Sequence, residues 1–483
     1  MVAQAQNKFL RHASPNEQRT ISREDLGFYN AVIISAVYDF GDGFDTTTAQ
    51  SFFEPIRQCI EAHPFLCVVV GDRHTDKGYF ERVPKIHLPD HITILDSVSK
   101  EGDGLAAIEE VMAGELNVPF AGGIPPWRIV VLPLGGSQAL VVFSFSHTIG
   151  DGPTGVSFHR SLLKAVREAS KIAPETVHPT VTTPETPLPA PFDTPEHLPI
   201  SWSFLLAPLL GNILPGFIAK LFGFKAQAST VDAGTWLGTR TMFFDPATNT
   251  NKLKLREMPA SAVTKAIHAA RAHDAKLSGT LARLLARGVG RAVGDNAGVT
   301  NYVVETAINM RRSVGVHEDE MGEFASGCYL AVPHVAACEP GTPLSEAEWE
   351  GAREATRKLA LSAAQLQDQP IGLLRYVSSV RKWLADKVGS ERGSSFEMSN
   401  IGLFDPDRDG GAASGGARIV KAIFAQPGHV TSSAIAFNII TLKGGALAYT
   451  VTWQVGALGI PEDEEEAFIT RVCDGIDADF AAL

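Results

Sequence analysis

Eight prolines between Pro174 and Pro199 constrain the fold of this chain more than any other feature of its sequence. Proline fixes its φ angle and has no backbone N–H to donate, so this density excludes both a helix and a central strand. The stretch therefore predicts an extended connector between two parts of the chain. We expect an N-terminal lobe over residues 1–172, a crossover linker with an apolar segment over 173–232, and a C-terminal lobe over 233–483.

Both parts of the chain mix strand and helix patterns. Apolar runs predict strands at 30–38 and 139–145, and the second is followed at 156–170 by a helix whose apolar residues recur every four positions. In the C-terminal part, strand patterns at 434–442 and 447–454 are joined by Lys-Gly-Gly, which is typical of a hairpin. The sequence predicts an α/β fold of mixed α+β character in two lobes.

The charge balance and the cysteines exclude several classes of protein. The 483 residues include 42 basic and 54 acidic side chains, a net charge of −12, which excludes a general affinity for nucleic acid. The five cysteines are an odd number without a CxxC pair, so neither a disulfide framework nor a metal site is predicted. The polar start of the sequence lacks the apolar core of a secretory signal, and we expect a cytoplasmic protein.

An apolar segment over 200–224 raises the question of a membrane span. Two prolines, Pro208 and Pro215, interrupt it and Lys220 falls inside it, which together argue against a span. The alternatives are reversible association with a membrane surface, or apolar structure that is buried or lines a substrate site. We expect the last of these, with the segment covering the mouth of the acceptor site, and do not expect membrane association.

The motif with the clearest chemical content is FSFSHTIGDGPTG at 143–155, between a predicted strand and a predicted helix. It places His147 and Asp151 four residues apart in a loop rich in glycine. One alternative is a turn with a hydrogen-bonded histidine. Another is a dinucleotide-binding G-x-G-x-x-G loop that includes Gly152 and Gly155, but Asp151 would then bring a carboxylate towards an anionic pyrophosphate.

Several segments, taken together in their order along the chain, resemble the fungal alcohol acetyltransferases. These enzymes share a superfamily with chloramphenicol acetyltransferase, the plant acyl-CoA-dependent acyltransferases (BAHD) and the condensation domains of nonribosomal peptide synthetases. The segments that carry the resemblance are LGFYNAVIISAVYDF (26–40), PPWRIVVLP, SHTIGDGPTGVSFHRSLL, AARAHDAKLSGTLARLLARG (269–288), VETAINMRRSVG (304–315), SNIG (399–402) and residues 424–456.

The resemblance implies two lobes with a channel between them and His147 midway along it. Acyl-CoA would enter from one face and the acceptor from the other. In the resembled family the aspartate of the motif turns away from the histidine and pairs with an arginine. Arg311 is the matching residue for Asp151, and Arg312 is the alternative because the two are adjacent. The plant Asp-Phe-Gly-Trp-Gly motif is absent, and Ser399 to Gly402 stand at the comparable late position.

The residues also make chemical sense for acyl transfer. An alcohol attacks a thioester poorly unless a base takes its proton, and neutral imidazole suits that role near pH 7. The oxyanion that forms needs hydrogen-bond donors, for which the candidates are Ser399, Asn400, Thr431 and Ser432. No Gly-x-Ser-x-Gly elbow occurs, so we expect direct transfer rather than a serine acyl-enzyme.

Further residues are predicted to bind the two substrates. Gly152, His429, Thr431 and Ser432 are the candidates for the acceptor site, with ordinary turn and strand-end hydrogen bonds as the alternative. One predicted helix carries three arginines spaced four apart, for which the alternatives are a solvated face and a clamp on the phosphates of CoA. These are Arg283, Arg287 and Arg291.

We therefore expect an acyl-CoA-dependent O-acyltransferase that moves an acetyl group to the hydroxyl of a small, largely apolar alcohol, with His147 as general base. The resemblance implies that this alcohol is a fungal secondary metabolite. No cofactor is expected to be bound permanently, acetyl-CoA being a co-substrate, and the chain is expected to be a monomer. The alternatives are a transferase that takes its acyl group from an acyl carrier protein, and a non-catalytic ligand-binding member of the fold.

Overall fold

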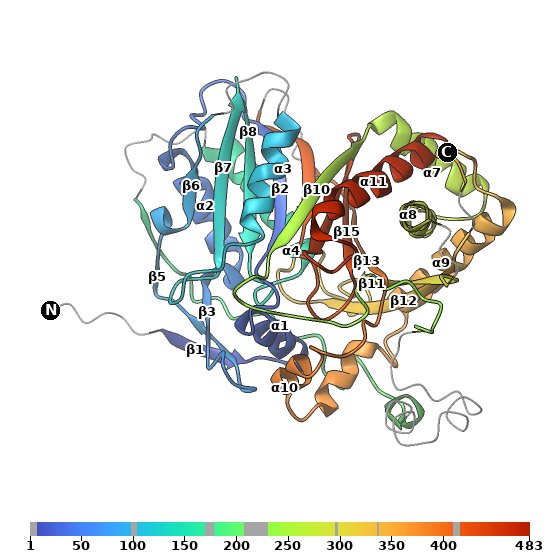
Figure 1. Cartoon of the computed structure of the whole chain (residues 1–483). Helices are drawn as coiled ribbons and strands as arrows, with labels where there is room; N and C mark the ends of the chain where they lie inside the picture. The colour runs from blue at the N-terminus through green and yellow to red at the C-terminus, as the bar shows by residue number, and fades with distance from the viewer. Residues whose placement is uncertain are drawn as a thin grey trace.

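Two separate β-sheets organise the protein into two lobes (Figure 1). The computed structural model describes residues 7–97, 104–169, 178–206, 230–294, 298–335, 338–408 and 416–483. The N-terminal sheet has the strand order β14-β2-β8-β7-β6, and the C-terminal sheet has the order β10-β16-β15-β13-β11-β12. The mixed α/β architecture in two lobes that the sequence predicts is confirmed.

In the N-terminal lobe a central sheet is covered by helices that pack on one another. The strands of this part of the chain are β1 (Lys8–His12), β2 (Val32–Asp39), β3 (Val68–Gly71), β4 (Tyr79–Arg82), β5 (Lys85–His87), β6 (Ile92–Ile94), β7 (Trp127–Gly135), β8 (Gln138–Phe145) and β9 (Thr180–Thr182), of which β1, β3 and β4 form a separate small sheet and β5 and β9 another. Its helices are α1 (Pro15–Asp25), α2 (Gln50–Ala62), α3 (Gly104–Glu115) and α4 (Gly152–Ala169). Helix α4 follows β8 directly and packs against α2 and β2. In the described part of the proline-rich connector, β9 pairs with the short β5, and this part adds no strand to either of the two larger sheets.

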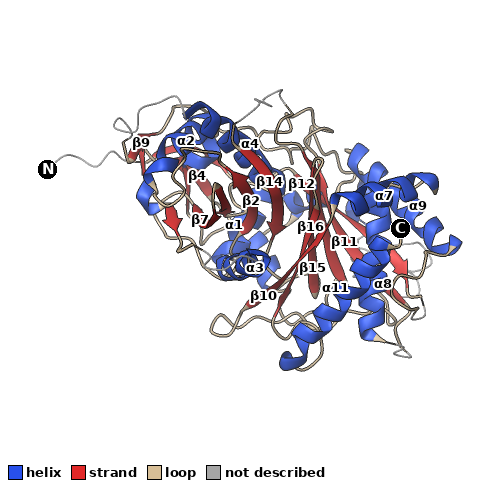
Figure 2. Ribbon diagram, turned by 90° about the horizontal axis from the view of Figure 1, so that it is seen from above, coloured by secondary structure: helices blue, strands red, loops and turns tan. Residues whose placement is uncertain are grey.

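In the C-terminal lobe a group of helices covers one face of the larger sheet (Figure 2). The strands that follow the connector are β10 (Asn251–Met258), β11 (Asn301–Asn309), β12 (Ala325–Pro333), β13 (Phe396–Phe404), β14 (Arg418–Ala425), β15 (Ile435–Leu442) and β16 (Leu447–Gln454). The helices are α7 (Ala260–Ala272), α8 (Leu277–Val293), α9 (Glu346–Ala364), α10 (Val380–Ala385) and α11 (Glu465–Ala481). Helix α8 packs between α9 and α11.

The predicted hairpin at the end of the chain is present as β15 and β16. The two strands pair antiparallel, and Gly444 in their connection has a φ of 72°, a conformation that glycine adopts without strain. Every residue of both strands is buried, which explains why each appears in the sequence as a nearly continuous apolar run.

Strand β14 joins the two lobes. Although it comes late in the sequence, it pairs antiparallel with β2 and so forms the edge of the N-terminal sheet. It also packs against β15 and β16 of the other sheet. Helix α1, near the start of the chain, likewise packs against α10 of the C-terminal part. These exchanges bring residues from both ends of the chain to the boundary between the lobes.

Candidate active site

The loop between β8 and α4 places His147 at the boundary between the lobes. β8 is buried along nearly its whole length, and the chain turns sharply after Phe145 before α4 begins. A Cβ atom on Gly155 would lie 2.2 Å from Cγ1 of Ile34, so glycine is needed there for α4 to pack closely on β2. The glycines of this loop therefore have a packing role in the strand-to-helix turn.

Asp151 forms a buried, two-pronged ion pair with Arg311. Both guanidinium nitrogens donate to its carboxylate at 2.7 Å, and the backbone N–H of Phe324 donates to it at 3.1 Å. Arg311 is fully buried and also donates to the carbonyl of Gly322 at 3.0 Å. The partner of Asp151 is thus Arg311, as the resemblance implied. This pair fixes the connection between β11 and β12 against the loop that carries His147.

The connection between β11 and β12 places Glu323 against His147. Nδ1 of His147 lies 2.6 Å from Oε2 of Glu323, whose side chain is fully buried. The oxygen lies off the direction of the ring N–H, so the contact is close but is not a well-aligned hydrogen bond. Burial opposes ionisation of Glu323, but the charge and close contact of the imidazole, together with the charge of Arg19, lower the pKa of the Glu323 carboxyl.

Sequence reasoning missed Glu323. It lies 176 positions from His147 in a loop without a recognisable motif. The one available clue was the expected pair between Asp151 and Arg311. That pair brings the segment that follows Arg311 close to the loop that carries His147. Glu323 is an acidic residue in that stretch, and the structure places it there.

Aromatic and polar contacts connect His147 with the late part of the chain. The ring of Tyr29 meets the ring of His147 edge-on at 5.4 Å between centroids, and the hydroxyl of Tyr29 donates to Gln426 at 2.8 Å. Gln426 donates in turn to Glu397 at 2.8 Å, and Nε2 of His429 lies 2.7 Å from the same carboxylate. Burial raises the pKa of Tyr29, so its phenol stays neutral and acts as a donor.

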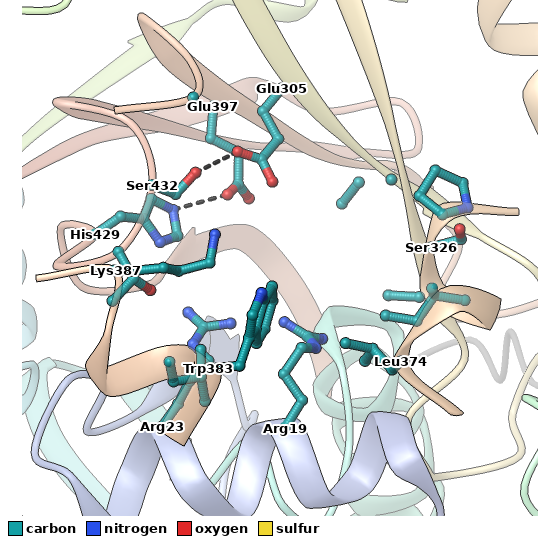
Figure 3. A pocket seen from close by; sticks show the side chains of 18 of the residues that line it. Arg19, Arg23, Glu305, Ser326, Leu374, Trp383, Lys387, Glu397, His429 and Ser432 are labelled. Carbon is teal, nitrogen blue, oxygen red and sulfur yellow. Dashed lines mark hydrogen bonds and ion pairs between the residues drawn. The ribbon is translucent and has the colours of Figure 1, made fainter. Parts of the chain in front are cut away.

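His147 is one of the residues that line a cavity of about 560 Å³. Figure 3 shows this cavity from close by. Its volume falls in the ordinary range for small-molecule sites. Three of the residues predicted for the acceptor site, His429, Thr431 and Ser432, line it. The hydroxyl of Ser432 donates to the carboxylate of Glu305. The lining also includes apolar side chains, among them Ile371, Leu374 and Trp383, and the charged residues Arg19, Arg23, Lys387 and Glu397.

Three other predicted site residues, Gly152, Ser399 and Asn400, lie elsewhere. Gly152, the first residue of α4, approaches Ile401 rather than the cavity. Asn400, on β13, accepts a hydrogen bond from the N–H of Gly402 at 2.8 Å and donates to Ser278 at 3.3 Å. Ser399 is buried on the same strand. None of these three is among the residues that line the cavity.

The three arginines of α8 do not form a phosphate clamp or a solvated face, and both expectations are wrong. Arg283 and Arg287 are only 5% and 6% exposed, and both lie close to the carboxylate of Glu348 on α9. Arg291 binds Asp479 of α11 through two nitrogens, at 2.7 and 2.8 Å. The charges are neutralised within the lobe because α9 and α11 cover this face of α8. The three arginines therefore join α8 to α9 and α11.

We therefore expect Arg291→Ala to destabilise the protein without affecting binding of acetyl-CoA. Loss of the guanidinium leaves Asp479 without its principal cation. Because the side chain of Asp479 is only 1% exposed, water cannot replace that partner. Removing one partner of a buried pair costs about 3–5 kcal/mol. Chemical denaturation should report this loss, while the KM for acetyl-CoA stays unchanged. Arg271→Ala, at an exposed position on α7, is the matched control. If Arg291→Ala instead raised the KM for acetyl-CoA and left the stability unchanged, the phosphate clamp would again be the better interpretation.

The predicted apolar segment over 200–224 is described only in part. Residues 207–224 lie outside the described residues. In the described part the side chain of Trp202 is 78% exposed. Within the ranges that the structure describes, no helix has the length and apolar character needed to cross a bilayer.

Comparison with known proteins supports the resemblance stated from the sequence. No protein-family profile matches the chain. The chain is 22% identical to the probable alcohol acetyltransferase crmB of Aspergillus fumigatus, over 95% of this chain and 97% of that protein. It is 23% identical to an uncharacterized protein of Schizosaccharomyces pombe, over 92% of this chain and 91% of that protein. Both similarities run through nearly the full length of the chain.

Solved structures share the fold. The trichothecene 15-O-acetyltransferase TRI3 of Fusarium sporotrichioides superimposes with a TM-score of 0.65 at 12% identity, covering 97% of this chain and 94% of that one. The condensation domain of the monacolin K polyketide synthase MokA does so with a TM-score of 0.57 at 12% identity, covering 98% of both chains. The resemblance to alcohol acetyltransferases and condensation domains is confirmed, and with it the two-lobed fold.

Proposed function

We propose that the protein transfers an acyl group, acetyl in the first instance, from CoA to the hydroxyl of a small molecule, with His147 as general base. The observation that carries this proposal is the contact between Nδ1 of His147 and the buried carboxylate of Glu323, beside a cavity that His147 itself lines. The names of the relatives, an alcohol acetyltransferase and an O-acetyltransferase, support the same reaction class.

Glu323 gives the imidazole its orientation and its tautomer. A carboxylate beside Nδ1 keeps the proton on that nitrogen, which leaves Nε2 to accept a proton from the substrate. The same negative charge stabilises the imidazolium that forms during attack. Asp151 does not act on the histidine, because both of its oxygens are engaged by Arg311. It holds the loop, and Glu323 positions the base.

The reaction then proceeds by direct transfer. As the acceptor oxygen bonds to the thioester carbonyl carbon, its proton moves to Nε2 of His147 and the carbonyl oxygen gains the negative charge. Collapse of this intermediate breaks the carbon–sulfur bond, and the imidazolium returns its proton to the departing CoA sulfur. For the oxyanion, the candidate donors that line the cavity are Thr431 and Ser432, whereas Ser399 does not line it. We leave Asn400 out, since its amide is engaged within β13 and with Ser278.

The likeness to condensation domains favours a second candidate, in which an acyl carrier protein delivers the acyl group. Support for CoA as donor comes from the solved starter condensation domain of rhizomide synthetase, which holds C8-CoA and has a TM-score of 0.53 at 14% identity. The donors can be separated by measuring thiol released from acetyl-CoA in the presence of a panel of alcohols, with His147→Ala as the control. Alcohol-dependent release above that control supports CoA. Transfer only from an acylated carrier protein supports the second candidate. If neither donor gives transfer, the result supports a non-catalytic protein that binds a ligand.

A further inference from the structure

Two cations in the cavity, Arg23 and Lys387, have no ion-pair partner. The guanidinium of Arg23, on α1, lies 4.2 Å from the ring of Tyr29, and the Lys387 ammonium lies 4.6 Å from the ring of Trp383. Among the residues that the structure describes, neither side chain makes a hydrogen bond or an ion pair. Both line the cavity, Arg23 from the side opposite Glu305 and Glu397, and Lys387 from beside His429 (Figure 3). Burial lowers the pKa of the Lys387 ammonium, and the charge of Glu305 opposes this shift.

The carboxylates around the same cavity, in contrast, already have partners. Glu397 is held by His429 and Gln426. Glu305 accepts hydrogen bonds from Ser432 and, at 3.0 Å, from Ser394. Both carboxylates thus accept hydrogen bonds or an ion pair from the protein, whereas among the described residues the two cations have no direct partner. Arg23 feels the charges of Glu397 and Glu305 only at longer range, and Lys387 that of Glu305. A half-buried charge without a partner is costly, and an anion that enters the cavity would remove that cost.

We propose that this cavity binds the acceptor through a carboxylate, so that the acceptor is a hydroxy acid whose acidic end rests on Arg23 and Lys387. This proposal rests on the proposed function and names its substrate class. The hydroxyl end of the molecule would reach His147, and Ile371, Leu374 and Trp383 would contact its apolar body. The expected acceptor is thereby refined from a largely apolar alcohol to one with a single anionic group.

The position of Arg23 favours the acceptor over the phosphates of CoA as the source of the anion. Arg23 stacks on Tyr29, and Tyr29 contacts His147, so only one aromatic ring separates the guanidinium from the base. The phosphates of CoA are separated from its thioester by the whole pantetheine arm. With the thioester at His147, those phosphates would lie well beyond Arg23.

Three probes of equal length but different charge test this proposal. They are 6-hydroxyhexanoate, hexane-1,6-diol and (6-hydroxyhexyl)trimethylammonium, with shorter and longer homologues to allow for the depth of the cavity. Binding is measured by titration calorimetry in the absence of acetyl-CoA, in the wild-type protein and in Lys387→Met and Arg23→Met. Lys382→Met is the matched control, because Lys382 is exposed and pairs with Asp386 on its own helix.

We expect the hydroxy acid of the best length to bind about tenfold more tightly than the diol, and each cavity variant to remove most of that preference while leaving the diol unchanged. Lys382→Met should retain the full preference. The proposal is overturned if the hydroxy acid binds no better than the diol, if the trimethylammonium probe binds best, or if the variants weaken both probes equally, which would indicate a structural role.

The same titrations separate this proposal from the proposed function. They need no turnover, and they can be repeated in His147→Ala, where the preference for the hydroxy acid should persist. Binding of the hydroxy acid without its acetylation would contradict the proposed transfer and leave the anion site standing. If the diol were acetylated at the same rate as the hydroxy acid, the proposed transfer would be supported and the anion site would be contradicted.

Discussion

Replacing His147 with alanine is expected to lower kcat by about 10²–10⁴-fold while leaving the affinity for acetyl-CoA within a few-fold of wild type. The reason is that proton removal assists the transition state of attack and not the binding of the donor. Steady-state assays of acetyl transfer, with calorimetric titration of acetyl-CoA, give the two quantities.

The matched control for this substitution is His87→Ala. The side chain of His87 is 51% exposed, pairs with Asp90 and lies outside the cavity. This variant should retain wild-type kcat. If His147→Ala also turned over at a rate near wild type, His147 would not be the base.

Breaking the pair between Asp151 and Arg311 should give the largest loss of stability. Either Asp151→Asn or Arg311→Ala leaves a buried charge without its partner, at a cost of about 3–5 kcal/mol in the free energy of unfolding. The double mutant should lose less than the sum of the two single losses, because each substitution removes the same interaction. Denaturant unfolding of the four proteins measures this directly. Activity should fall along with stability, since the pair fixes the loop that carries Glu323.

Arg312→Ala provides the control for this cycle. Arg312 is adjacent in sequence, exposed, and was the alternative partner in the sequence analysis. Its substitution should change stability by less than about 0.5 kcal/mol, as is usual at the surface. Fully additive losses for Asp151 and Arg311 would mean that the two side chains act independently.

The elements of this fold could be predicted where the sequence carries a local period. The helix after the motif and the terminal hairpin are cases of this kind, because their apolar patterns extend over whole elements. The pair between Asp151 and Arg311 could also be anticipated, but only because each residue sits in a segment that resembles a known one. Local pattern and family likeness together gave the two lobes and the position of His147 between them.

What the sequence could not show were contacts between elements far apart in the chain. The three arginines of α8 share one face by their spacing, but only the fold reveals that α9 and α11 cover that face and supply Glu348 and Asp479. Glu323 was missed for the same reason. Its role depends on a loop held against His147 by an ion pair elsewhere, and no periodicity marks it. The two cations of the cavity, Arg23 and Lys387, likewise come from α1 and from the turn that follows α10.

The central claim is that Glu323 works through His147, and a double-mutant cycle on kcat tests it most directly. Glu323→Gln keeps the shape of the side chain but removes its charge, and it should lower kcat by about 10²–10⁴-fold in the wild-type background. In the His147→Ala background the same substitution should cost almost nothing further, because the group it orients is already gone. A loss in His147→Ala as large as that in wild type would show that Glu323 acts independently of the histidine, and would contradict this account of the site.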